Sequence, residues 1–136
     1  MATTKKITEA LTGIPLFSRC SGRDLKAIAR HVEIIEVPLG RPIVRQGDNG
    51  DAMFVIIRGS AEVVRDGSNV STLGEGDYFG ELALLDPAPR AATVAAIEDC
   101  ELAAISVRMF RVLLRELPGL SAKLLADLAS RVRESR

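Results

Sequence analysis

The chain has few of the residues that metal centres and disulfide frameworks require. Among its 136 residues there is a single histidine, His31, and there are two cysteines. One histidine cannot supply the clustered imidazoles that a cupin-type metal centre needs, so we expect no metal ligand set and a structural or surface role for His31. Cys20 and Cys100 are 80 positions apart and form no Cys-x-x-Cys pair. We therefore expect both thiols to be reduced and partly buried.

An excess of either charge is also absent, as is any long apolar run. Lys and Arg total 18, and Asp and Glu total 18, so no overall basic field attracts nucleic acid and any anion recognition must be local. The longest apolar stretches, residues 52–57 and 91–97, are far shorter than the roughly 20 residues of a membrane-spanning helix. Glu9, Thr12 and Pro15 interrupt any signal-peptide core. These features predict a cytoplasmic protein with no transmembrane segment and no nucleic-acid contact.

The length and composition fit one globular domain over residues 1–136. Hydrophobic residues make up 47% of the chain and charged residues 26%, which is ordinary for a soluble domain. Ser21 and Asp24 have the residue types of a helix start. Apolar residues follow them at helical spacing: Leu25, Ile28, Ala29 and Val32. We expect residues 1–32 to form an N-terminal helical segment.

From residue 33 the sequence changes to short β-branched pieces that glycine, aspartate or asparagine separates. The predicted strands are residues 34–37, 42–44, 53–57, 61–64, 70–73 and 100–105, with a small-residue strand at the end of segment 79–96. The gaps between them are too short for crossover helices, so a parallel α/β fold is disfavoured. Closely spaced turns between short strands indicate an antiparallel sandwich or barrel with flanking helices.

Two helices are predicted after the last strand. Ser106 has the residue type of a helix cap, and the first helix has one apolar stripe: Met109, Phe110, Leu113, Leu114 and Leu117. Pro118 and Gly119 break this helix. The second helix is expected to have Leu120, Leu124, Leu125, Leu128 and Val132 on one side, with Lys123, Asp127, Arg131 and Glu134 outside it.

The most informative segment is residues 79–96, which places an acidic residue and an arginine nine positions apart around a turn. Gly80 allows close approach of the backbone, and residues 81–85 can form a short helical turn whose free N–H groups favour a phosphate. Arg90 supplies a planar fork for two phosphate oxygens. Glu81 can accept hydrogen bonds from ligand hydroxyls. The segment therefore predicts a site for a small anionic ligand.

This segment resembles the phosphate-binding cassette of the cyclic nucleotide-binding domain family, which includes catabolite activators, protein kinase A regulatory subunits and cyclic nucleotide-gated channel sensors. Residues 45–63 are similar to the first hairpins of that family's jelly roll. The resemblance implies an antiparallel jelly-roll β-barrel over residues 33–105 and C-terminal hinge and lid helices over residues 106–134. It implies these ligand-binding residues: Gly80, Glu81, Leu82, Ala83, Arg90, Ala91, Ala92 and Thr93, with Leu128 and Arg131 in the lid.

In this family the glutamate takes the ribose 2′-hydroxyl and the arginine takes the cyclic phosphate. The resemblance implies a regulatory domain whose C-terminal helices move when the ligand binds, and an effector protein or domain as partner.

Ala91 stands where members that select cyclic GMP usually have Thr, so cyclic AMP is the expected ligand, with cyclic GMP also possible. No cofactor and no catalysis are expected, because hydrolysis would need a metal cluster or a placed base and nucleophile near Glu81 or Arg90.

Two alternatives stay open at this point. The chain resembles the sensor half of a catabolite-activator-like transcription regulator, but it ends at Arg136 with no recognition helix. A protein-interaction module with a degenerate, empty cassette is the other alternative, and the loss of Glu81 or Arg90 would favour it. Both residues are present.

Overall fold

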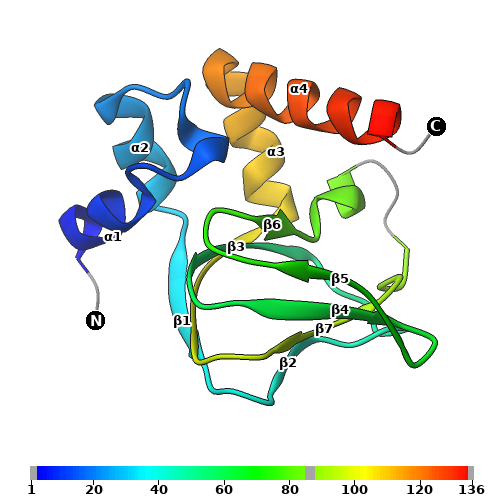
Figure 1. Ribbon diagram of the computed structural model, residues 1–136. Coiled ribbons are helices and arrows are strands. Elements are labelled where there is room, and N and C mark those ends of the chain that lie inside the picture. The colour runs from blue at the N-terminus through cyan, green and yellow to red at the C-terminus, as the bar shows by residue number, and fades with distance from the viewer. Residues whose placement is uncertain (1–2, 85–87, 135–136) are drawn as a thin grey trace.

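The protein is a β-roll of two sheets with most of its helices gathered on one side (Figure 1). The computed structural model describes residues 3–84 and 88–134. The helices are α1 (Thr4–Leu11), the 3₁₀ helix η1 (Pro15–Phe17), α2 (Gly22–Ala29), the 3₁₀ helix η2 (Glu81–Leu84), α3 (Val107–Glu116) and α4 (Pro118–Glu134). The strands are β1 (Glu33–Val37), β2 (Pro42–Val44), β3 (Ala52–Arg58), β4 (Ala61–Arg65), β5 (Ser68–Leu73), β6 (Tyr78–Phe79), β7 (Thr93–Ala96) and β8 (Cys100–Ser106).

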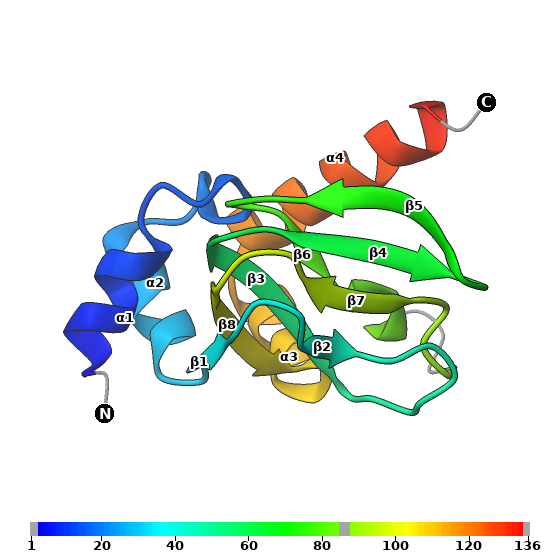
Figure 2. The ribbon, with the colours of Figure 1, turned by 60° about the horizontal axis from the view of Figure 1, so that its bottom comes forward.

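The eight strands pair in two antiparallel four-stranded sheets. One has the order β1-β8-β3-β6 and the other the order β2-β7-β4-β5, whose strands lie side by side in Figure 2. This arrangement confirms the predicted fold class, an antiparallel jelly roll with an N-terminal helical segment and two C-terminal helices. Every predicted strand is present. The two-residue strand β6, which the sequence analysis did not predict, pairs with β3 and leads into η2.

Strands β3 and β8 divide the core into two parts because successive side chains of a strand point to opposite faces. In β3, Met53 and Val55 belong to the apolar cluster beneath the helices, whereas Phe54 and Ile56 belong to the cluster inside the roll. The same alternation in β8 separates Ala103 and Ile105 from Cys100 and Leu102. One sheet thus connects the helical layer to the interior of the roll.

The N-terminal helices begin and pack as their residue types predict. Ser21 and Asp24 form a reciprocal capping box at the start of α2, and Ile28 and Ala29 are buried. The helix ends at Ala29, so Val32, which the sequence analysis placed on the same stripe, follows the helix and is half-buried. Cys20 and Cys100 do not form a disulfide with each other; Cys20 is partly buried, as expected, whereas Cys100 is fully buried.

Helices α3 and α4 are separate, as predicted from Pro118 and Gly119. Leu117 has φ −119° and ψ 90°, which is outside the helical region and ends α3. A Cβ atom on Gly119 would clash with the carbonyl oxygen of Arg19. Glycine therefore allows the start of α4 to approach the backbone between η1 and α2.

The orientation of α4 differs from the prediction. Leu120 and Leu124 are buried, but Leu125 and Val132 are 66% and 57% exposed, so the apolar side of the helix is buried only in its first half. The expectation that Asp127 and Arg131 lie outside this side is wrong, because both contact the roll, whereas Lys123 pairs with Asp127 on the same helix and Glu134 is exposed. At 3.6 residues per turn, positions 120, 124, 127 and 131 share one face of the helix, which changes along its length from apolar to charged.

Candidate functional site

A pocket of about 810 Å³ lies between η2, the interior of the β-roll and the far part of α4. Its volume is within the range of roughly 300–1,000 Å³ that is usual for small-molecule sites. The strands contribute Val44, Val63, Leu73, Phe79 and Val94 to the apolar part of its wall. Its polar groups include Glu81, Arg90 and Arg131, so a ligand with both apolar and anionic parts is complementary to it.

Arg90 is held by the backbone on which it packs. Its guanidinium Nη2 donates to the carbonyl oxygen of Ala52 at 2.7 Å, while its backbone N–H donates to the carbonyl oxygen of Asp48 at 2.8 Å. Burial lowers the pKa of the guanidinium, and the nearby Asp51 carboxylate acts in the opposite direction. Arginine remains protonated under all ordinary conditions, so Arg90 brings one positive charge to a half-buried position in the pocket wall.

Two glycines leave the space that the Arg90 side chain occupies. A Cβ atom at Gly50 would lie 2.5 Å from Nη2 of Arg90, and one at Gly80 would lie 2.9 Å from Nη1. Gly80 also has φ +92°, a conformation that residues with a side chain rarely adopt. The sequence analysis identified Gly80 for its close approach to the backbone, but it missed Gly50, which is 40 positions from Arg90.

Glu81 is the buried carboxylate of the site, with 7% of its surface exposed. It begins η2, the short helical turn that the sequence predicts. Its Oε1 accepts a hydrogen bond from Nη1 of Arg131 at 2.6 Å, in an ion pair that joins the cassette to α4. A carboxylate has about four lone-pair sites, so Glu81 retains the capacity to accept a ligand hydroxyl beside Arg131.

Tyr78 and Asp127 connect α4 to the roll next to this ion pair. The buried Tyr78 hydroxyl donates to Oδ2 of Asp127 at 2.9 Å, and Nζ of Lys123 donates to Oδ1 of Asp127 at 2.7 Å. The guanidinium of Arg131 lies 4.8 Å from the centre of the Tyr78 ring. Sequence analysis did not single out Tyr78 as a site residue. Its position two residues before Gly80 is the only sequence signal that could have suggested it.

The other predicted site residues fall into three groups. Leu82, Ala83, Ala91 and Ala92 line the pocket together with Gly80, Glu81, Arg90 and Arg131. Thr93 follows them on β7, where its hydroxyl oxygen accepts a hydrogen bond from the backbone N–H of Gln46 at 2.9 Å. Leu128 lines a neighbouring cavity. Within the predicted cassette of residues 79–96, residues 85–87 lie outside the described part of the chain.

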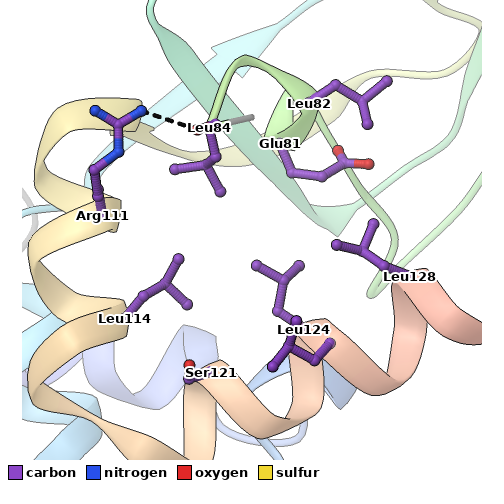
Figure 3. Close-up of a pocket in the computed structure, with 9 residues that line it drawn as sticks. Glu81, Leu82, Leu84, Arg111, Leu114, Ser121, Leu124 and Leu128 are labelled. Carbon is purple, nitrogen blue, oxygen red and sulfur yellow. Dashed lines mark hydrogen bonds between the residues drawn. The ribbon is translucent and has the colours of Figure 1, made fainter. Parts of the chain in front are cut away.

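The neighbouring cavity, of about 220 Å³, separates η2 from the C-terminal helices (Figure 3). Leu82 and Leu84 border it from η2, Leu114 from α3, and Leu124 and Leu128 from α4. Arg111 lies at its edge and donates from Nη2 to the carbonyl oxygen of Leu84 at 3.0 Å. Because Glu81 borders both this cavity and the main pocket, η2 is the wall between them.

Comparison with known proteins identifies the family and the fold of the chain. The family model described as "Cyclic nucleotide-binding domain" matches residues 34–116, which include most of the roll and α3. The chain belongs to the cyclic nucleotide-binding domain family. It is 41% identical to a cAMP-dependent protein kinase regulatory subunit of Mycosarcoma maydis over 119 residues, covering 81% of this chain and 23% of that protein.

Two further similarities come from a bacterial relative and a solved structure. The chain is 33% identical over 130 residues to the cyclic AMP receptor protein of Thermus thermophilus, covering 92% of this chain and 60% of that protein. A structure described as cAMP-bound PfPKA-R (141-441) superimposes with a TM-score of 0.83 at 27% identity, covering 96% of this chain and 45% of that chain. The chain thus spans between about a quarter and three fifths of the length of these two curated relatives.

The described residues add two negative findings. Within residues 3–84 and 88–134, no helix is both long and apolar enough to cross a membrane. In the same part of the chain, no three histidine, cysteine, aspartate or glutamate residues are grouped so that they could hold a metal ion.

Proposed function

We propose that this domain is a cyclic AMP-preferring sensor that couples ligand binding to a rearrangement of its C-terminal helices. The observation that carries the proposal is the position of Glu81, which lines the nucleotide pocket and is also paired with Arg131 of α4 at 2.6 Å. A ligand that binds to this carboxylate therefore acts directly on a contact that holds the helix. Family membership supports the ligand class, and the geometry supports the way in which binding is transmitted.

The cyclic phosphate binds to Arg90 in this proposal. The guanidinium has five N–H donors in a planar fork, and one of them is used to hold it on the carbonyl of Ala52. A pocket wall that supplies one positive charge suits the single negative charge of a cyclic phosphate diester. Hydrogen bonds between charged groups contribute about 1.5–3 kcal/mol, so Arg90 is expected to dominate the affinity.

The ribose binds at Glu81, and the base extends toward α4 and the strands. A carboxylate next to an anion is unfavourable unless it accepts a hydrogen bond, and the 2′-hydroxyl of the ribose supplies that bond. Ala91 lines the pocket and offers no hydroxyl to the amino group of guanine, which favours cyclic AMP. Arg131 is the predicted lid residue that lines this pocket, whereas Leu128 borders the neighbouring cavity.

The output of the sensor is the position of α4. The cavity between η2 and the C-terminal helices leaves space for these elements to approach each other when η2 closes on a ligand. Pro118 and Gly119 stay the predicted hinge, and the close approach of Gly119 to Arg19 supplies a pivot at the start of α4. A helix with two packings of similar free energy transmits ligand binding to an effector.

The effector in this proposal is a protein or a further domain, and the sensor acts in the cytoplasm without catalysis of its own and without contact to nucleic acid. The two curated relatives support a separate effector, since one is a regulatory subunit of a kinase and the other is a receptor protein. In both, the similar region makes up less than two thirds of the protein.

The test of the proposal uses Glu81→Ala with cyclic AMP and 2′-deoxy cyclic AMP in calorimetric titrations. The wild-type domain is expected to bind cyclic AMP more tightly than the deoxy ligand. In the variant, the loss should be much smaller for the deoxy ligand, because that ligand has already lost the hydroxyl that Glu81 binds. Equal losses for both ligands would show that Glu81 does not bind the ribose.

A further inference from the structure

The far half of α4 is held to the roll by polar contacts. Leu120 and Leu124 are the buried residues of this helix, and both belong to its first two turns. Beyond them, Leu128 is partly buried against the core cluster and borders the neighbouring cavity, whereas Leu125 and Val132 are mostly exposed. The contacts of the far half include the Tyr78–Asp127 hydrogen bond and the Arg131–Glu81 ion pair. The packing of Leu128 holds the far half against the core, and the position of Arg131 over the pocket depends in addition on these directional contacts, which are lost after small displacements.

The two contacts form one connected network. Asp127 and Arg131 are four residues apart, so they lie one turn from each other on the same face of α4. Tyr78 touches both, since its hydroxyl donates to Asp127 and its ring lies 4.8 Å below the guanidinium of Arg131. Lys123, one turn before Asp127, donates to the other carboxylate oxygen at 2.7 Å. The series runs from Lys123 through Asp127, Tyr78 and Arg131 to Glu81.

Each polar group in this network is satisfied by another member. Tyr78 is only 6% exposed, so its hydroxyl requires a partner inside the protein, and Asp127 is that partner. Burial opposes the ionisation of Asp127, but the hydrogen bonds from Lys123 and Tyr78, together with the positive charges of Lys123 and Arg131, outweigh it and lower the pKa of the carboxyl. Asp127 is thus held as an anion that accepts from two donors. This arrangement fixes the rotation of α4 about its own axis at Asp127, which lies one helical turn before Arg131.

We infer that Tyr78 and Asp127 are positioning residues for ribose recognition: their hydrogen bond orients α4 so that Arg131 meets Glu81. The inference rests on the proposed function, and it adds two residues that do not need to touch the ribose. Arg131 then fixes one oxygen of Glu81 and leaves the other to accept the 2′-hydroxyl. Without the Tyr78 hydroxyl, the far half of α4 loses its orientation, Glu81 loses a fixed geometry, and the site distinguishes ribose from deoxyribose less well.

Tyr78→Phe is the direct test because it removes the hydroxyl and retains the ring under Arg131. The first measurement is the ratio of the dissociation constants for 2′-deoxy cyclic AMP and cyclic AMP. We expect Tyr78→Phe to lower this ratio roughly three- to tenfold, the effect of one hydrogen bond. Asp127→Asn should act in the same direction. Glu134→Gln is the matched control on α4 and should leave the ratio unchanged.

A double-mutant cycle with Arg131→Ala separates positioning from general loss of stability. If Tyr78 acts through Arg131, Tyr78→Phe should not change the ratio further once Arg131 is absent. Thermal unfolding of each variant shows whether the fold is retained. A ratio that Tyr78→Phe leaves unchanged in a folded protein, or lowers equally with and without Arg131, would overturn the inference.

Hydrogen exchange of the ligand-free protein supplies a measurement that does not depend on nucleotide binding. The amides of residues 125–134 should exchange faster in Tyr78→Phe and in Asp127→Asn than in the wild type, while β3 stays protected. Unchanged protection of α4 in both variants would contradict its positioning by this network. If the wild-type domain bound no cyclic nucleotide, the proposed function would fall, and the exchange experiment would still decide whether Tyr78 and Asp127 position the helix.

Discussion

Gly50→Ala should weaken nucleotide binding without unfolding the domain. The new Cβ atom would lie 2.5 Å from Nη2, 2.6 Å from Nε and 2.8 Å from Cζ of Arg90. Optimal separations of non-bonded heavy atoms are about 3.5–4.0 Å, so the guanidinium has to move by about 1 Å. The atoms in conflict belong to the end of a flexible side chain. The φ angle of Gly50 is also outside the left-handed region, so the backbone tolerates alanine.

The expected loss of affinity in Gly50→Ala follows from the hydrogen bonds of Arg90 that this displacement breaks. A shift of about 1 Å takes a hydrogen bond beyond its useful length of about 3.2 Å, including the 2.7 Å bond from Arg90 to the carbonyl of Ala52. Charge-assisted bonds to a phosphate contribute about 1.5–3 kcal/mol, and the loss of part of this energy corresponds to roughly tenfold weaker binding. Alanine also restricts the unfolded chain, which offsets any small loss of folding stability.

The assay is a calorimetric titration with cyclic AMP combined with thermal unfolding of the same sample. Gly74→Ala is the matched control, because no atom lies within 4 Å of its Cβ position and its φ is also outside the left-handed region. The control should bind like the wild type. If Gly50→Ala also bound like the wild type, Arg90 would not be the phosphate ligand in the orientation described, and the reasoning would be refuted.

Four further predictions follow from named contacts. Arg90→Lys should recover only part of the cyclic AMP affinity that Arg90→Ala loses, because the positive charge remains but the planar guanidinium fork does not. Equal affinity of the wild type, Arg90→Lys and Arg90→Ala in titrations would contradict this prediction. Ala91→Thr should strengthen cyclic GMP binding and narrow the preference for cyclic AMP, and a wild-type preference for cyclic GMP would contradict the argument. The lowered pKa of Asp127 contributes stability above its unfolded-state pKa of about 3.9 that is lost as the pH falls through the folded-state value, so Asp127→Asn should flatten the acid limb of a stability–pH curve. Cyclic AMP should change the hydrogen exchange of residues 106–134, and identical protection with and without ligand would make α3 and α4 a fixed scaffold.

The strands and the cassette could be predicted from sequence because local patterns determine them. The continuous apolar run of β3, which is buried on both faces, and the small turns between strands are visible in short windows of sequence. The cassette is also local, since Glu81 and Arg90 are nine residues apart and their residue types match one chemistry. The helix start at Ser21 depends on a capping box within four residues.

The contacts that sequence analysis missed join residues far apart in the chain. Tyr78 and Asp127 are 49 positions apart, and nothing in either local pattern indicates the other. The assignment of α4 by hydrophobicity failed because its charged residues Asp127 and Arg131 find polar partners on the roll, so charge did not mark the solvent side. Strand β6 has only two residues and is too short to produce a periodic signal.

The central claim is that the pocket between η2, the roll and α4 binds a cyclic nucleotide through Glu81 and Arg90. The most direct measurement is an isothermal titration of the wild type and of the Glu81→Ala/Arg90→Ala double variant with cyclic AMP and cyclic GMP. We predict one ligand per chain, tighter binding of cyclic AMP, and loss of binding in the folded double variant. Absence of binding in the wild type, or equal binding in the double variant, would contradict the claim.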